Sequence, residues 1–256
     1  MITAVAALVA SGLTAFAPSA PASAAGAVQL RFVTANINFD ADQSVVRDKW
    51  RNLIAPNADV VFLQEAKNVR LSDFVETSTW IIRHGTSAAE DDSEDKLGSA
   101  LLIRRAVATE VADYGLVKGV DASPCPRGGI MTRWLAKIKV KLTNGRWIRV
   151  ASLHMPPLRC QTGPGGPYDR MADSVVAFAD LTDMPTVLGA DWNKVVDDDP
   201  NAIGRRSGLE PNGPDLGERI DGFMYSPRLR NCCLTQLGLA SRGHPAVQVK
   251  LTVPAP

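Results

Sequence analysis

The segment 187–193 places two polar side chains, Asp191 and Asn193, directly after a short apolar run. Side chains at positions i and i+2 of an extended backbone point the same way, so both can face one site at the end of a buried strand. A fold can build a polar site over its apolar core in this manner. Asp and Asn are also ordinary turn residues, and the motif alone leaves both interpretations open.

The segment 59–65 repeats this pattern, because an apolar run ends in the carboxylate of Glu65. A buried carboxylate is costly unless it binds a cation or has a hydrogen-bond partner. Glu65 is therefore a candidate ligand at the edge of a sheet. A structural glutamate that closes the strand is the alternative.

Three histidines occur in the chain, and two of them stand at expected strand ends. His154 ends the expected strand 147–154, and His244 precedes the expected strand 245–253. An imidazole can act as an acid or a base near neutral pH. His244 before proline could instead close a turn, Asp221 could cap the loop before it, and we take His84 as a surface or strand residue.

The elements that must position these groups follow from the hydrophobic pattern. Apolar alternation or short apolar runs predict strands, and helical spacing predicts two helices, the first capped by Asp42. A turn at 143–146 predicts a hairpin. The acidic segment 85–96 indicates a solvated loop rather than a calcium site. The expected strands are 28–36, 59–65, 99–103, 107–114, 130–142, 147–154, 187–191, 219–225, 228–237 and 245–253; the helices are 42–54 and 168–181; residues 197–217 form an irregular loop with one helical turn.

Composition limits the size of the fold but not the substrate. The chain has 256 residues, of which 45% are hydrophobic and 21% charged, which suits one large domain with a substantial core. The net charge of +1 indicates no global attraction to nucleic acid, membranes or acidic partners. No internal repeat or linker is evident, and we expect a monomer.

The first 24 residues are uncharged and end in prolines and small residues. This pattern predicts a secretory signal peptide over 1–24 and a mature domain over 25–256, although the basic residue that usually begins such a segment is missing. A membrane anchor is the alternative, and prolines interrupt the run before it reaches the ~20 apolar residues needed to span. We therefore expect a secreted protein.

Export implies an oxidising compartment, where the four cysteines are expected to pair. Cys125 and Cys160 lie in Pro/Gly-rich loops that flank neighbouring expected strands, and we expect a disulfide between them. Cys232 and Cys233 are adjacent and point to opposite faces of a strand, so a bridge between them would be strained. No Cys/His spacing suggests zinc.

Six short motifs in order resemble those of the endonuclease/exonuclease/phosphatase superfamily, to which deoxyribonuclease I, exonuclease III and secreted neutral sphingomyelinases belong. The resemblance covers nearly the whole mature chain and implies a four-layer α/β/β/α sandwich, deoxyribonuclease I-like, with all six motifs at one end. The motifs are Asn36 within 34–37, Gln64-Glu65, Ser152-Leu153-His154, Gly189-Ala190-Asp191-Trp192-Asn193, Arg219-Ile220-Asp221 and Ser241-Arg242-Gly243-His244.

The resemblance implies metal-assisted phosphodiester hydrolysis. Glu65 and Asn36 would hold Mg²⁺ (or Mn²⁺), since Mg²⁺ prefers one or two carboxylates with waters and phosphate oxygens. His244 would be the general base, oriented by Asp221. The remaining expected roles are charge stabilisation or leaving-group protonation by His154, orientation of water and phosphate by Asp191 and Asn193, and phosphate binding by Arg133.

Departures from the family pattern widen the functional alternatives. Gly243 stands where relatives carry an aspartate of the metal site, and Gly243→Asp would restore it if the backbone permits. Ala190 separates the usual Gly-Asp pair, and no carboxylate to orient His154 is evident near Leu97 or Gly98. A secreted nuclease is the first hypothesis; a sphingomyelinase-type enzyme acting on a phospholipid head group and a weakly active or inactive binding protein are the others.

Overall fold

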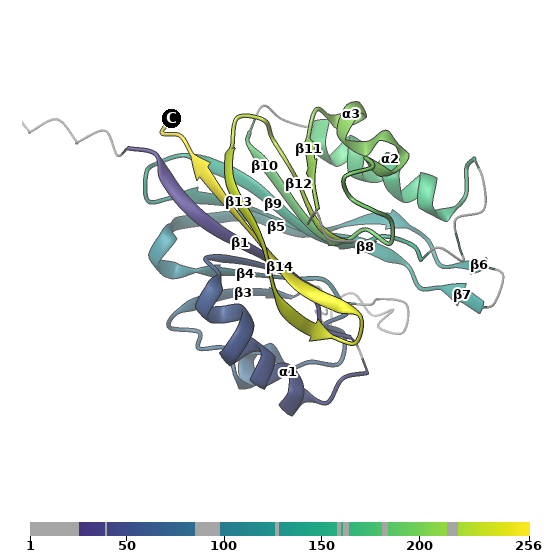
Figure 1. Cartoon of the computed structure of the whole chain (residues 1–256), viewed down its shortest axis with the longest axis horizontal. Coiled ribbons are helices and arrows are strands. Elements are labelled where there is room, and N and C mark those ends of the chain that lie inside the picture. Colours follow the sequence, from purple (N-terminus) through teal and green to yellow (C-terminus); the bar gives the residue numbers. More distant parts are fainter. Residues whose placement is uncertain are drawn as a thin grey trace, which may run out of the picture.

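The computed structural model describes residues 26–38, 40–84, 98–125, 128–157, 160, 164–180, 184–213 and 220–256. These residues form two large sheets packed face to face, with helices on the outer faces (Figure 1). This is the α/β sandwich that the sequence predicts. The expected signal peptide and the acidic segment 85–96 lie outside the described residues. Among the described helices, none combines the length and apolar character needed to cross a membrane.

The first sheet has the strand order β13-β14-β1-β2-β4-β3. Its central strands β1 and β2 run parallel, and β14 and β4 flank them antiparallel. All five residues of β2 are buried because both faces of the sheet are covered. The strands are β1 (Val28–Asn36), β2 (Val60–Gln64), β3 (Trp80–His84), β4 (Ala100–Arg104), β13 (Arg230–Ser241) and β14 (His244–Val253).

The second sheet has the strand order β11-β12-β10-β9-β8-β5, and its central strands β9 and β10 also run parallel. A separate two-stranded hairpin, β6 with β7, projects from this half of the molecule (Figure 1). The strands are β5 (Ala108–Val120), β6 (Ser123–Cys125), β7 (Gly128–Ile130), β8 (Arg133–Leu142), β9 (Trp147–His154), β10 (Thr186–Asp191), β11 (Glu210–Asn212) and β12 (Asp221–Tyr225).

The two sheets meet in an apolar core, and they approach closely near the end of β10. The rings of Phe62 and Phe223 lie 5.9 Å apart between the sheets. A Cβ at Gly189 would come within 2.4 Å of the Phe62 ring, so only glycine fits at this position. The glycine of the 189–193 motif therefore lets the sheets approach closely beneath Asp191.

The helices cover the outer faces. Helix α1 (Gln43–Lys49) begins at Asp42, whose Oδ1 accepts a 2.7 Å hydrogen bond from the Ser44 amide, and it continues as a π-helical turn over Trp50–Ile54 and a 3₁₀ turn over Ala55–Asn57. Helix α2 (Pro167–Asp180) packs on the second sheet, next to α3 (Ile203–Ser207). Short 3₁₀ turns occupy Leu71–Asp73, Arg105–Val107 and Pro200–Ala202.

The expected strands 28–36 and 147–154 match β1 and β9 residue for residue. The expected strand 130–142 is wrong at its start, because β7 ends at Ile130 and β8 begins at Arg133. The strand expected over 228–237 is longer in the structure, since β13 pairs with β14 along its length by absorbing three register shifts.

The structure contains two disulfides, Cys125–Cys160 and Cys232–Cys233. The sequence left the pairing of Cys232 and Cys233 open, and the structure joins them to each other. The pairing of β13 with β14 shifts register between Asn231 and Cys233, which marks a β-bulge. A bulge breaks the alternation of side chains across the strand, so the opposite-face argument does not hold there.

We expect Cys125→Ala/Cys160→Ala to lower the free energy of unfolding by roughly 3–4 kcal/mol, because the bridge closes a 35-residue separation. Urea denaturation of the oxidised proteins measures the loss. Cys232→Ala/Cys233→Ala is the matched control, and its effect should be much smaller because it closes almost no loop. Peptide mapping without reductant that found Cys125 joined to Cys232 or Cys233 would overturn the assignment.

Candidate active site

Strand direction brings the candidate residues to one end of the sandwich. Asn36, His154 and Asp191 are the last residues of β1, β9 and β10, and Glu65 follows β2 directly. Asp221 and His244 are the first residues of β12 and β14, which run antiparallel to those strands. The carboxyl ends of β1, β2, β9 and β10 and the amino ends of β12 and β14 therefore lie at the same end of the sandwich. Residues far apart in sequence become neighbours there.

The first sheet contributes Asn36 and Glu65. Asn36 Nδ2 donates to Glu65 Oε1 at 3.2 Å and to Asp191 Oδ2 at 3.0 Å, so it links carboxylates from the two sheets. Glu65 has a φ of 59°, a left-handed conformation that is costly for a residue with a side chain. This conformation ends the ladder of β2 immediately before Glu65 joins the site.

Asp191 is the centre of the cluster and is 1% exposed. Its Oδ2 lies 3.3 Å from His154 Nε2 and 3.6 Å from His244 Nδ1, and its Oδ1 accepts a 2.9 Å hydrogen bond from the Asn193 amide. Burial and the charge of Asp221 raise the pKa of Asp191 to about 7, although neighbouring donors and His244 oppose them. The site therefore holds more negative charge than its own groups neutralise.

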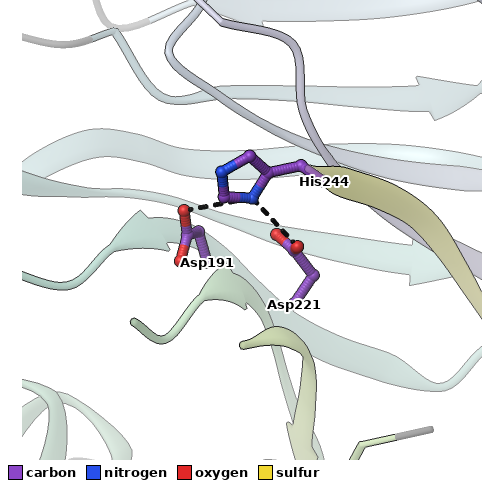
Figure 2. Close-up of side chains that lie close together, drawn as sticks. All are labelled: Asp191, Asp221 and His244. Atoms are coloured by element: carbon purple, nitrogen blue, oxygen red, sulfur yellow. Dashed lines mark hydrogen bonds and ion pairs between the residues drawn. The ribbon is translucent and has the colours of Figure 1, made fainter. Parts of the chain in front are cut away.

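His244 and Asp221 form a hydrogen-bonded pair, with 3.0 Å between Nδ1 and Oδ2. Figure 2 shows the His244 ring between Asp191 and Asp221, and the dashed lines mark its contacts with both. Burial lowers the pKa of His244, but the hydrogen bond to Asp221 and the charges of Asp221, Asp191 and Glu65 outweigh burial and raise it to about 9. Burial also raises the pKa of Asp221.

His154 has a different electrostatic environment. Burial, with the charges of Arg133 and His244, holds the pKa of His154 well below its usual value. His154 is therefore a neutral imidazole at neutral pH. Its Nδ1 lies 3.6 Å from Glu65 Oε1, which is too long for a hydrogen bond, and has no hydrogen-bond partner among the described residues. Glu65 is therefore a carboxylate neighbour of His154 Nδ1 but does not accept a hydrogen bond from it.

The two remaining expected site residues are Asn193 and Arg133. Asn193 has a φ of 52°, so the expectation of an extended backbone from Asp191 to Asn193 is wrong. A left-handed turn directs its Nδ2 to the carbonyl oxygen of Met155, 2.8 Å away. Arg133 is buried at the start of β8, within electrostatic reach of His154.

The donor set fits a divalent cation. Ligand atoms of Asp191, Asp221 and His244 all lie within 4.8 Å of one another, and the buried Asp221 Oδ1 has no hydrogen-bond partner in the part of the chain that the structure describes. Carboxylate oxygens are the ligands that Mg²⁺ and Mn²⁺ prefer. The sequence argument placed the metal on Asn36 and Glu65; in the structure Asn36 Oδ1 accepts from the Asn38 amide, and its amide group faces the carboxylates.

A buried polar network below the site was missed by the sequence analysis. Gln64 Nε2 donates to Ser152 Oγ at 3.1 Å, and Ser152 Oγ donates to the carbonyl oxygen of Leu63 at 2.8 Å. These bonds join β2 to β9 across the core. Ser241 Oγ similarly donates to the Asn36 carbonyl oxygen at 2.7 Å. Gln64 directly before Glu65 and Ser152 two positions before His154 were the available signal.

Gly243→Asp is expected to leave metal affinity and activity unimproved. Gly243 has a φ of +79° in the turn between β13 and β14, and a Cβ there meets nothing within 4 Å. The penalty is therefore backbone strain, roughly 1 kcal/mol for a residue with a side chain. Urea denaturation measures the loss of stability, and Mn²⁺ titration measures the metal affinity. Gly243→Ala is the control, because it has the same backbone strain without the added carboxylate. A large gain in activity at low Mg²⁺ for Gly243→Asp alone would contradict this expectation.

Comparison with family models supports the resemblance noted in the sequence. The model of the Endonuclease/Exonuclease/phosphatase family matches residues 33–239. This range holds every candidate site residue except His244. A search of curated proteins found no match.

Solved structures share the fold at low sequence identity. An endonuclease/exonuclease/phosphatase family protein from Bacteroides thetaiotaomicron is 16% identical, with a TM-score of 0.66 over 89% of this chain and 98% of its own. The mannosyl-6-phosphatase Bt3783 of the same species is 14% identical, with a TM-score of 0.59 over 87% and 99%. The human Nocturnin catalytic domain is 12% identical, with a TM-score of 0.60 over 87% and 94%.

Proposed function

The chain belongs to the endonuclease/exonuclease/phosphatase family, and from this membership and the site geometry we propose that it is a secreted, Mg²⁺- or Mn²⁺-dependent phosphodiesterase that hydrolyses nucleic acid. The observation that carries the proposal is the convergence of Glu65, Asp191, Asp221, His154 and His244 on one cluster with contacts of 3.0–3.6 Å. Such a cluster combines a cation site with two imidazoles in different charge states.

The proposed mechanism assigns separate tasks to the two histidines. His244, held by Asp221, accepts the proton of the attacking water. Neutral His154 donates a hydrogen bond to a phosphoryl oxygen as charge develops, and Arg133 adds positive charge on that side. Asp191 and Glu65 would hold the cation through their carboxylate oxygens.

A bound divalent cation would polarise the phosphoryl oxygens and offset the carboxylate charges that raise the pKa of His244. Offsetting those charges favours the neutral imidazole that a general base requires. The amide group of Asn36 donates to the carboxylates of both Glu65 and Asp191 and so fixes their positions relative to each other.

Basic residues beside the acidic centre favour a polyanionic substrate. Lys67 follows Glu65 by two positions, Lys194 follows Asn193 directly, and the exposed Arg242 precedes His244 by two positions. Such cations suit phosphates on either side of the scissile bond. The lipid alternative has less support, because none of the five tryptophans is exposed to contact a membrane.

The test is an activity screen of the chain from residue 25 onward. DNA, RNA, sphingomyelin, bis(p-nitrophenyl) phosphate and mannose 6-phosphate are offered with Mg²⁺, with Mn²⁺ and with chelator. We expect hydrolysis of a nucleic acid that chelator abolishes and metal restores. Hydrolysis of sphingomyelin alone would favour the sphingomyelinase-type enzyme. If no phosphate ester is hydrolysed at saturating metal, a binding protein is the better account.

Secretion is tested separately, by expression of the whole chain in a host that exports it. We propose cleavage after Ala24 or Ala25, so the exported protein should begin at Ala25 or Gly26 in N-terminal sequencing. Retention of residues 1–24 in the product would favour a membrane anchor instead.

Arg242→Gln is expected to raise KM for a polynucleotide severalfold, because one phosphate contact is lost, while KM for bis(p-nitrophenyl) phosphate stays unchanged. Steady-state kinetics at two salt concentrations measure both. Arg230→Gln is the matched control, since Arg230 is also exposed and stands at the other end of β13. Equal effects of the two substitutions would count against nucleic-acid contact at Arg242.

A further inference from the structure

Arg149 is a buried cation whose partners are all neutral. It is 5% exposed and lies near the start of β9. Its Nη2 donates to the Ala179 carbonyl oxygen at 2.9 Å, its Nε and Nη2 each lie 3.4 Å from Thr186 Oγ1, and its guanidinium stacks 4.2 Å from the Phe178 ring. Among the described residues, no carboxylate forms an ion pair with it.

Neutral partners compensate a buried charge only in part. Burial lowers the pKa of Arg149, which reflects the cost of removing its charge from water. The Ala179 carbonyl belongs to the carboxyl end of α2, which carries a partial negative charge, so Arg149 also stabilises that helix end. Helix capping accounts for Nη2 but not for the further cations that surround Arg149.

Arg149 opens onto a cavity of about 250 Å³ on the outer face of the second sheet, lined also by Lys137, Lys139 and Asp113. Lys139 is the strand neighbour of Arg149, and Lys137 is two residues away on the same face of β8. Lys139 Nζ lies 2.5 Å from Asp113 Oδ2, whereas Lys137 Nζ donates to the Asp113 carbonyl oxygen at 3.1 Å. Three cations thus face one carboxylate.

The wall of the cavity opposite the lysines depends on a β-bulge. The register of β5 against β8 shifts between Ala112 and Gly115, and Asp113 has a φ of 51°. This left-handed residue presents both its carbonyl oxygen and its carboxylate to the lysines. These contacts hold the amines of both lysines beside Asp113, although the Lys139 side chain is still 38% exposed.

We propose that this basic pocket binds a tetrahedral oxyanion, phosphate or sulfate. Arg149 Nη1, which donates to no acceptor among the described residues, and two ammonium groups can supply charge-assisted hydrogen bonds to such an ion. The volume is below the ~300 Å³ at which sites for larger small molecules begin, so an ion or a single phosphoryl group suits it.

The basic pocket is distinct from the candidate active site. Arg149 precedes His154 by five residues in β9, about 16 Å along the strand, and points to the opposite face of the sheet. Anion binding there does not depend on the proposed phosphodiesterase activity. The ion would offset the charges of Arg149, Lys137 and Lys139 and so stabilise the folded chain.

Calorimetric titration of phosphate, and separately of sulfate, into the chelated whole chain tests the proposal, with chloride at equal ionic strength as reference. We expect saturable binding of at least one oxyanion, weakened about tenfold or more by Lys137→Gln or Arg149→Gln. Lys250→Gln is the matched control, because Lys250 lies on β14 of the other sheet, and it should bind like wild type.

Three outcomes would overturn the proposal: no saturable binding by wild type, equal binding by Lys137→Gln, or equal weakening by Lys250→Gln. Because Arg149→Gln also removes the cap of α2 and could impair folding, Lys137→Gln decides the result if that variant is unstable. Phosphodiesterase activity should be the same in Lys137→Gln and wild type. Loss of anion binding and failure of the proposed function are therefore separable.

Discussion

His244→Ala is expected to lower kcat for phosphodiester hydrolysis by about 10²–10⁴-fold, with a smaller change in KM. His244 Nδ1 is engaged by Asp221 Oδ2 at 3.0 Å, which leaves Nε2 for water. Its side chain is 23% exposed, so water can reach the ring. Loss of the imidazole removes the proton acceptor but opens no cavity in the core, and thermal unfolding should show an intact fold.

Asp221→Asn tests the role of the Asp221–His244 pair, because it removes the carboxylate and leaves the His244 imidazole in place. The hydrogen bond and charge of Asp221 raise the pKa of His244, so this variant should lower that pKa, as NMR titration of the chelated protein can measure. In the double variant with His244→Ala the losses in kcat should be far from additive, because the two residues act as one unit. Additive losses, or a His244→Ala enzyme with normal kcat, would remove His244 from the reaction.

The fold, and the gathering of the candidate site residues at one end of it, could be predicted because they depend on local patterns. An apolar run that stops at a polar residue specifies both a buried strand and the edge where its side chain emerges, as β10 and Asp191 illustrate. Six such motifs in order define the end of the sandwich, and the family match to residues 33–239 confirms the resemblance. Individual chemical roles for these residues stay predictions.

Backbone conformation could not be predicted in the same way. The left-handed φ values of Glu65 and Asn193 are not encoded by any periodicity in the sequence. The bulges in β13 and β5 are equally hidden, although one allows the Cys232–Cys233 bridge and the other builds the wall of the basic pocket. A one-residue shift in pairing changes which side chains meet.

Asp191→Asn is expected to abolish most activity and yet stabilise the metal-free protein at neutral pH. Burial and the charge of Asp221 raise the pKa of Asp191 to about 7, well above the ~4 of an unfolded aspartate. The ionised form is therefore disfavoured by the fold, and its cost is largest above pH 7. Stability of the wild type should rise as pH falls from about 7 toward 4, when the folded chain takes up the proton that the unfolded chain still lacks.

Asparagine has the same shape and no charge, so the variant should show a higher Tm than wild type in chelator at pH 8 and a flatter dependence on pH between 4 and 7. Divalent metal should reverse the order: wild type gains stability from binding, whereas Asp191→Asn gains less because a ligand oxygen is lost. Activity should fall by about 10²-fold or more, since Asp191 also contacts both histidines. A metal-free Asp191→Asn that is less stable than wild type at pH 8 would show that the carboxylate stabilises the fold, and the cluster would then be structural in origin.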